Sequence, residues 1–229
     1  MNKKYSLFFA GLALIAFIYS CEKDFVAPTP TASKSFVEEF DTVAKLYSQG
    51  WVFVNNSKPQ GAATWMQGEY ISGKFGPQGF PAYSYKASGD EYIFAGYASG
   101  NGLSTLSSWM FTPPIEMKNG DKFSFYTRTY TGTTYPDRLQ VRMNLTDAST
   151  DVGRDSSSVG KYTTVLLDLN PGLTTSGYPQ VWTKYEFTVS GLPAPLKRRI
   201  AFRYYVPGGG PSGANSNAIG IDQFSFQSL

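Results

Sequence analysis

The chain has 229 residues, and its formal net charge of +3 depends partly on Lys3 and Lys4, the only charged residues among the first twenty. The remainder is nearly neutral, which offers no electrostatic basis for binding nucleic acid. The sequence contains no histidine and a single cysteine. This composition excludes Ser-His-Asp and Cys-His nucleophile activation as well as zinc held by histidine.

Residues 1–20 have the layout of an export signal, with a basic start, an apolar run over 7–18 and a small residue before the cysteine. The run is about a dozen residues, too short to span a bilayer core that needs ~20. It ends in Ile18-Tyr19-Ser20-Cys21, which resembles the lipobox of bacterial lipoproteins. We therefore expect cleavage before Cys21 and attachment to a membrane through lipid on Cys21. An uncleaved anchor helix is the alternative.

Residues 21–35 predict a flexible tether, because they include Pro28 and Pro30 and few residues to bury. Glu22 and Asp24 flank Lys23. This charged start resembles the short signal that directs some lipoproteins of the Bacteroidetes to the outer face of the outer membrane. We expect an outer-membrane lipoprotein of the bacterial cell envelope, displayed at the surface; the start of a solvated linker is the alternative.

Residues 36–229 predict one all-β domain. Apolar and polar residues alternate with period two over 123–128, 139–145, 185–190 and 219–226, whereas a helical stripe appears only briefly over 36–46. Turn-forming residues at 119–121 and 207–211 separate the alternating runs. Strands with one polar face are typical of antiparallel sheets. We therefore expect an antiparallel two-sheet β-sandwich of jelly-roll type.

Several segments of this domain match a known family in their order along the chain. They are Glu39-Phe40-Asp41 with Gly50-Trp51, the Trp and Thr-Pro-Pro element of 108–115, and segments 120–128, 136–142, 178–182, 202–204 and 213–222. Together they resemble the choice-of-anchor J family, which is related to the cleaved-adhesin domains of bacterial surface proteins. The resemblance implies a jelly-roll sandwich on an exported protein, and related adhesin domains carry structural calcium.

Calcium is therefore the cofactor to consider, because it takes oxygen ligands and needs no histidine. A jelly roll brings its first and last strands together. We expect Glu39 or Asp41 of the first strand to meet Asp222 of the last strand and to form a structural calcium site. The alternative is that these acids are solvated or paired with arginine.

Aromatic residues make up 16% of the chain and suggest a sugar-binding surface, although most rings must form the core. The alternation places Tyr126, Arg128 and Tyr130 on one polar face, and we take these three as candidate ligand-binding residues. A second group lies in a Gly/Ser-rich region that predicts surface loops. It comprises Tyr70, Tyr83, Tyr85, Tyr92 and Tyr97.

Several charged residues favour structural interpretations. Asp137 and Arg138 are adjacent and predict an ion pair. Arg142 and Arg203 predict solvated positions on the outer side of their strands. The basic residues 197–199 predict a solvated start to the strand that follows.

The remaining chemistry argues against catalysis. A carboxylate-only glycan hydrolase needs two acids facing a cleft, and the segment 220–224 carries Asp222 alone. We expect a lipid-anchored, non-catalytic binding or adhesion module with glycans as the candidate ligand. The alternatives are a structural or accessory lipoprotein that packs against partner proteins and, less favoured, a carboxylate-only hydrolase.

Overall fold

The computed structural model describes residues 35–70, 79–84 and 89–229, which all fall in one compact unit. The expected signal peptide, Cys21 and most of the tether lie outside the described residues. No helix in the described ranges is long and apolar enough to cross a membrane.

The short helical segments are α1 (Val43–Leu46) and η1 (Tyr97–Ser99). The strands are β1 (Phe36–Glu38), β2 (Val52–Asn55), β3 (Lys58–Gln60), β4 (Met66–Glu69), β5 (Glu91–Gly96), β6 (Gly100–Phe111), β7 (Ile115–Met117), β8 (Lys122–Thr129), β9 (Leu139–Met143), β10 (Thr164–Leu169), β11 (Thr183–Thr188), β12 (Leu196–Arg198), β13 (Ile200–Gly209) and β14 (Ala218–Gln227).

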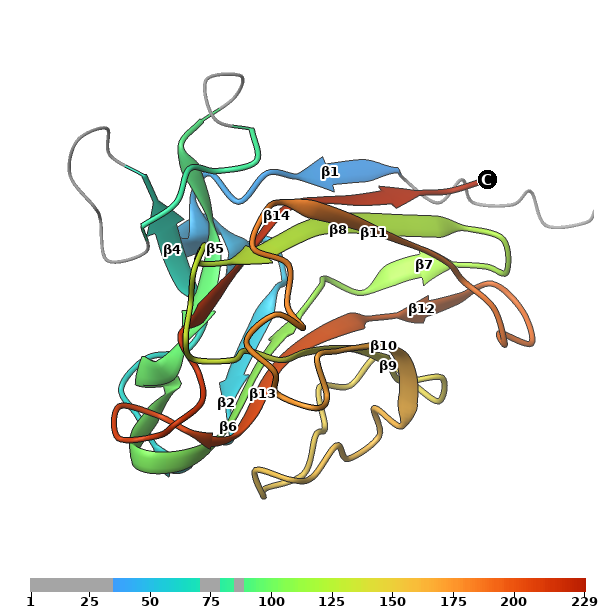
Figure 1. Ribbon diagram of the computed structural model, residues 1–229. Coiled ribbons are helices and arrows are strands. Elements are labelled where there is room, and N and C mark those ends of the chain that lie inside the picture. Colours follow the sequence, from blue (N-terminus) through green and yellow to red (C-terminus); the bar gives the residue numbers. More distant parts are fainter. Residues whose placement is uncertain (1–34, 71–78, 85–88) are drawn as a thin grey trace, which may run out of the picture. The chain divides into compact units, whose positions relative to one another are not determined.

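The described strands form two six-stranded antiparallel sheets and a two-stranded ladder of β7 and β12. The first sheet has the order β11-β8-β14-β5-β4, and β1 also pairs with β14. The second sheet has the order β10-β9-β13-β6-β2, and β3 also pairs with β6. Figure 1 shows β8, β11 and β14 in one layer and β6, β9 and β13 in the other. The prediction of an all-β, two-sheet sandwich is confirmed.

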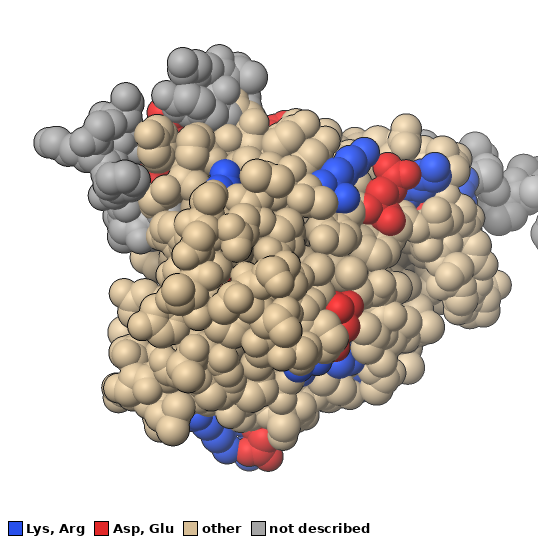
Figure 2. Space-filling model, viewed as in Figure 1, with Lys and Arg blue, Asp and Glu red and all other residues tan. Residues whose placement is uncertain are grey.

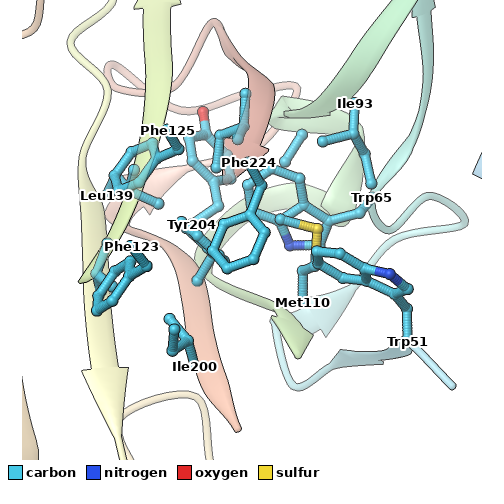
Figure 3. Packing of buried hydrophobic residues seen from close by; sticks show 14 of the residues in the cluster. Trp51, Trp65, Ile93, Met110, Phe123, Phe125, Leu139, Ile200, Tyr204 and Phe224 are labelled. Carbon is cyan, nitrogen blue, oxygen red and sulfur yellow. The ribbon is translucent and has the colours of Figure 1, made fainter. Parts of the chain in front are cut away.

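Apolar residues from both sheets meet between the layers. The ring of Phe202 on β13 lies 4.9 Å from that of Phe125 on β8 and 6.0 Å from that of Phe224 on β14, edge-on to both. All three are buried, and Figure 3 shows Phe125 and Phe224 with Tyr204, Met110 and Trp51 in the same core. The period-two alternation therefore points these rings inward, and their burial is the main contribution to the stability of the sandwich.

A bulge in β14 determines which strands can pair with it. The register against β8 shifts between Asp222 and Ser225, and Gln223 adopts a positive φ of 48°. An extra residue of this kind bends the strand and interrupts its ladder. β8 pairs along one edge of β14. On the opposite edge, residues 218–221 before the bulge pair with β5, and residues 224–226 after it pair with β1. The first and last strands thus lie side by side, as expected, and the backbone N–H of Ser228 donates to Ser35 Oγ at 3.0 Å.

The loop of residues 144–163 covers the outer face of the second sheet. Its Val152 and Tyr162 pack against Trp109 and Phe111 of β6. Because this loop excludes water from the part of the face that it covers, the outward-pointing Trp109 and Phe111 are fully buried.

Arg203 shows this effect, and its predicted solvated position is wrong. Its side chain is almost completely buried, with the guanidinium 3.8 Å from the Tyr205 ring centroid and 4.8 Å from that of Trp109. It donates to Ser107 Oγ at 3.0 Å and also to the backbone carbonyl of Ser156. Arg203 therefore fastens the covering loop to the sheet through cation–π contacts and hydrogen bonds. Burial lowers the pKa of Arg203 to about 9.

The predicted ion pair between Asp137 and Arg138 is also wrong. Arg138 forms its ion pair with Asp168, with Nε and Nη2 at 2.7 and 2.6 Å from the two carboxylate oxygens. Adjacent residues of an extended chain point to opposite sides, so Asp137 turns into the interior instead. There it accepts hydrogen bonds from the hydroxyls of Tyr204 at 2.5 Å and Thr129 at 2.6 Å.

Of the basic residues 197–199, only Lys197 is exposed as predicted. Arg198 is buried and donates from Nε and Nη2 to the carbonyl of Leu145 at 3.1 and 2.9 Å. Arg199 donates to the carbonyls of Gly50 and Thr112. Both guanidinium groups satisfy backbone acceptors that loops leave unpaired, which the charge pattern alone does not reveal.

Candidate ligand-binding face on the first sheet

The outer face of the first sheet carries the predicted ligand-binding residues. On β8, Phe125 points into the core, so Tyr126 and Arg128 point outward. The register places Lys184 of β11 and Asp222 of β14 directly beside Tyr126, one on each side. A polar row therefore crosses three strands at this level.

The segment 79–84 lies over this face and is held there by aromatic contacts. The ring of Phe80 stacks on Tyr92 of β5 at 4.8 Å and meets Tyr130 edge-on at 5.3 Å. The guanidinium of Arg128 lies 4.7 Å from the centroid of the same Phe80 ring. The indole N–H of Trp182 donates to the carbonyl of Pro81 at 2.8 Å. Arg128 and Tyr130 thus support the covering segment rather than form an open platform.

The segment brings Tyr83 onto Tyr126. The two rings stack at 3.6 Å with an interplanar angle of 17°, and 40% of Tyr83 remains exposed. Asp222 Oδ2 accepts the backbone N–H of Tyr83 at 2.8 Å, which fixes the main chain beside the ring. A hydrogen bond to the side chain of Tyr126 raises the pKa of Tyr83, so its hydroxyl stays neutral at physiological pH. The result is an aromatic surface whose outer part is open to solvent.

A hollow of about 370 Å³ lies on the same face, beyond Lys184; we call it the sheet-face hollow. Its outward-pointing lining residues are Val37, Lys122, Ser124, Lys184, Glu186, Ser225 and Gln227. Glu186 is paired with Lys184 at 3.2 Å and with Lys122 at 3.7 Å. Hydroxyl, amide, ammonium and carboxylate groups therefore line the hollow next to the tyrosine pair. On the side of the molecule in Figure 2, charged side chains occur in small groups and most of the surface is uncharged.

Not all tyrosines of the second predicted group lie on this face. Tyr92, which the sequence predicts in a surface loop, is fully buried in β5 under Phe80. Tyr85 lies outside the described residues. The sequence does not single out Lys184 and Trp182, because only the strand register and the folded segment 79–84 bring them to this face.

Glu39 and Asp222 approach each other, as the calcium prediction requires. Gln223 Nε2 donates to Glu39 Oε1 at 3.4 Å, while Glu39 Oε2 is buried without a partner among the described residues. Burial raises the pKa of Asp222 to about 7, and the charge of Glu39 adds to the increase. β1 ends at Glu38, so Glu39 follows the strand instead of belonging to it.

Asp41 does not join this pair. It is exposed in the turn before α1 and lies beside Gly89, where an added Cβ would be 3.0 Å from Asp41 Oδ1. No group of three or more His, Cys, Asp or Glu residues in the described ranges is arranged to hold a metal ion. The orphaned Glu39 oxygen suits a cation, but both Asp222 oxygens already accept backbone N–H groups, from Tyr83 and Gln223. Of the two acids expected to meet Asp222, Glu39 does so and Asp41 does not.

Comparison with solved structures identifies the fold. The K1 cleaved adhesin domain of Lys-gingipain from Porphyromonas gingivalis W83 matches with a TM-score of 0.52 and 17% identity, over 86% of this chain and 99% of that domain. The K3 cleaved adhesin domain of the same protein matches with a TM-score of 0.51 and 13% identity, over 85% of this chain and 100% of that domain. The described part of the chain thus has the sandwich fold of these adhesin domains.

A weaker similarity is to TmCBM61 in complex with β-1,4-galactotriose, with a TM-score of 0.43 and 9% identity over 84% of this chain and 99% of that one. No protein-family model matches the chain. No curated protein matches it either. Membership in the choice-of-anchor J family therefore stays a prediction.

Proposed function

We propose that this chain is a non-catalytic binding module of the bacterial cell envelope, anchored through lipid on Cys21, that binds a glycan on the outer face of its first sheet. The observation that carries the ligand class is the stacked pair of Tyr83 and Tyr126, which presents a partly exposed ring beside a polar hollow. The C–H faces of a sugar ring are apolar and pack on aromatic rings, while its hydroxyls need hydrogen-bond partners.

The position of the ring supports this proposal. Three contacts hold Tyr83 in place. Its ring stacks on Tyr126 of β8, and its backbone N–H donates to Asp222 of β14. Phe80, in the same segment, packs on Tyr92 of β5. A ring fixed in this way loses little conformational entropy when a ligand covers it. Lys184 lies next to Tyr126 in the register and also lines the sheet-face hollow, so one bound chain of sugars can contact both.

The experiment is a glycan-array screen of the full chain in a detergent without a sugar headgroup, followed by titration of the best oligosaccharide. We expect Tyr83→Ala to weaken binding about tenfold, as loss of roughly 1.4 kcal/mol of stacking implies. Tyr83→Phe keeps the ring and should retain most of the affinity. Tyr47→Ala is the matched control, because Tyr47 is 60% exposed but lies away from this face against Phe53.

The proposal fails if no glycan binds, or if Tyr83→Ala and Tyr47→Ala bind the best oligosaccharide equally well. Capture of an envelope protein in place of any glycan would favour the accessory-lipoprotein alternative. Turnover of the oligosaccharide would instead favour the hydrolase.

A further inference from the structure

A second hollow, of about 180 Å³, lies among the loops at one end of the sandwich and shares no residue with the sheet-face hollow. We call it the end hollow. Its lining residues are Tyr97, Tyr135, Gly210, Pro211, Gly213, Ser216 and Asn217. They come from η1, from the loop after β8 and from the connection between β13 and β14, so only the folded chain brings them together.

Two aromatic rings border the end hollow and are open to solvent. Tyr97 and Tyr135 are each 49% exposed. In the described part of the chain, neither ring stacks on another aromatic ring, unlike the paired Tyr83 and Tyr126. About half of each side chain is therefore available to a ligand that enters the hollow.

Hydrogen bonds hold the floor of the end hollow in place. Asn217 donates its backbone N–H to Asp137 Oδ1 at 2.9 Å and its Nδ2 to Thr133 Oγ1 at 3.0 Å. Its carbonyl accepts the backbone N–H of Tyr97 at 3.0 Å. These bonds fix the side-chain amide, whose Oδ1 has no partner among the described residues and is an acceptor that a ligand hydroxyl can use.

The glycines of the rim keep the space open. A Cβ on Gly213 would lie 2.4 Å from the carbonyl oxygen of Gly208, and one on Gly210 would lie 2.3 Å from the carbonyl oxygen of Gly102. The Gly210 N–H donates to Ser216 Oγ at 2.9 Å, which closes the turn. A side chain at either glycine would therefore deform the loop that forms this part of the rim.

The lining determines the chemical class of the ligand. None of its residues is charged, so nothing in the end hollow offsets the desolvation of an ionic group. Its volume is below the ~300 Å³ of typical ligand pockets, which limits it to one small ring. Two phenol rings favour a ring with apolar faces, and the Asn217 amide favours one that carries hydroxyls. We propose that the end hollow is a second ligand site that binds a single neutral monosaccharide unit between Tyr97 and Tyr135.

The experiment is saturation-transfer NMR on the full chain in a detergent without a sugar headgroup. The probes are the methyl β-glycosides of glucose, galactose, mannose, xylose and N-acetylglucosamine, each at millimolar concentration. We expect at least one glycoside to give a transfer signal, and we expect Tyr97→Ala with Tyr135→Ala to reduce that signal at least fivefold. Because Tyr83 belongs to the proposed sheet-face site, the double substitution is also made in a Tyr83→Ala background, where we expect the same fivefold loss. Tyr47→Ala should leave the signal unchanged.

The outcomes separate this site from the sheet face. Absence of signal from all five glycosides would overturn the end hollow as a monosaccharide site, as would a signal in the Tyr83→Ala background that survives the double substitution. Loss of the signal in Tyr83→Ala alone would place the binding on the sheet face and also overturn the proposal. The melting temperature of each variant is measured first, and the single substitutions Tyr97→Ala and Tyr135→Ala replace the double one if it unfolds.

Discussion

The carboxylate of Asp222 accepts the backbone N–H of Tyr83 at 2.8 Å, across 139 positions of the sequence. This bond joins the last strand of the sandwich to the segment that lies over its first sheet. Both ends of the bond matter to the proposed glycan face, because Tyr83 supplies the exposed ring and Asp222 lies beside Tyr126 on the sheet below. An acid predicted as a calcium ligand thus positions a predicted sugar-binding tyrosine.

Stability should fall as the pH rises from about 4 to about 7. Burial raises the pKa of Asp137 to about 6 and that of Asp222 to about 7, from 3.8 in the unfolded chain. Between these values the folded state holds more protons than the unfolded state, so each unit of pH removes stability, by about 1.4 kcal/mol for each fully titrating group. We expect a melting temperature several degrees higher at pH 5 than at pH 8, measured by circular dichroism.

Asp137→Asn supplies the control for this pH dependence. The Asn Oδ1 can still accept from Tyr204 and Asn217. The Thr129 hydroxyl can turn its one hydrogen to the carbonyl of Ala218 and accept from Nδ2. The variant should be more stable than the wild type at pH 8 and should lose part of the slope between pH 5 and pH 8. An unchanged slope would show that Asp137 does not titrate in this range.

Arg203→Met should destabilise the protein by about 2–4 kcal/mol, since the cation–π contacts and hydrogen bonds of the buried guanidinium disappear together. The side chain of Met fills much of the same volume between Trp109 and Tyr205, which limits the cavity. Urea unfolding measures the change, with Arg154→Met as the control because Arg154 is exposed in the same loop. Equal midpoints for the two variants would contradict a role for Arg203 in fastening the loop.

Calcium binding by Glu39 and Asp222 stays a prediction with a direct test. We expect millimolar calcium to raise the melting temperature of the chain and a chelator to lower it, and we expect Asp222→Asn to remove both effects. Asp41→Asn should behave as the wild type, because Asp41 lies apart from the carboxylate pair. If calcium and chelator leave the wild-type melting temperature unchanged, the acids are a metal-free pair.

Lipidation of Cys21 predicts that the chain expressed in a bacterial host incorporates labelled palmitate and sediments with membranes. Cys21→Ser should abolish incorporation and move the protein to the soluble envelope fraction. Ser20→Ala is a control that keeps both the cysteine and a small residue before it. If Cys21→Ser stays in the membrane fraction without label, the apolar run over 7–18 is itself the anchor.

Prediction from the sequence succeeded where the alternation of apolar and polar residues alone sets which way the side chains point. The alternation of Phe123 to Arg128 places Phe125 inside and Tyr126 outside, because side chains of a strand point to opposite faces whatever their partners are. It failed for Arg203 and Tyr92. Alternation placed Arg203 on a wet outer face, but the loop 144–163 covers it. The Gly/Ser-rich composition placed Tyr92 in a surface loop, but Tyr92 lies on β5 under the segment 79–84.

The sequence by itself predicted the sandwich, which residues point inward along its alternating segments, and the histidine- and thiol-dependent chemistry that its composition excludes, since composition and period-two patterns need no knowledge of long-range contacts. Only the tertiary structure decided which acids meet and which tyrosines stay exposed. The bulge at Gln223 pairs β14 with β5 and then β1, which brings Glu39 to Asp222 and leaves Asp41 aside. Loop packing likewise buries Tyr92 and opens Tyr83, Tyr97 and Tyr135. These outcomes depend on contacts between residues far apart in the chain, which no local pattern encodes.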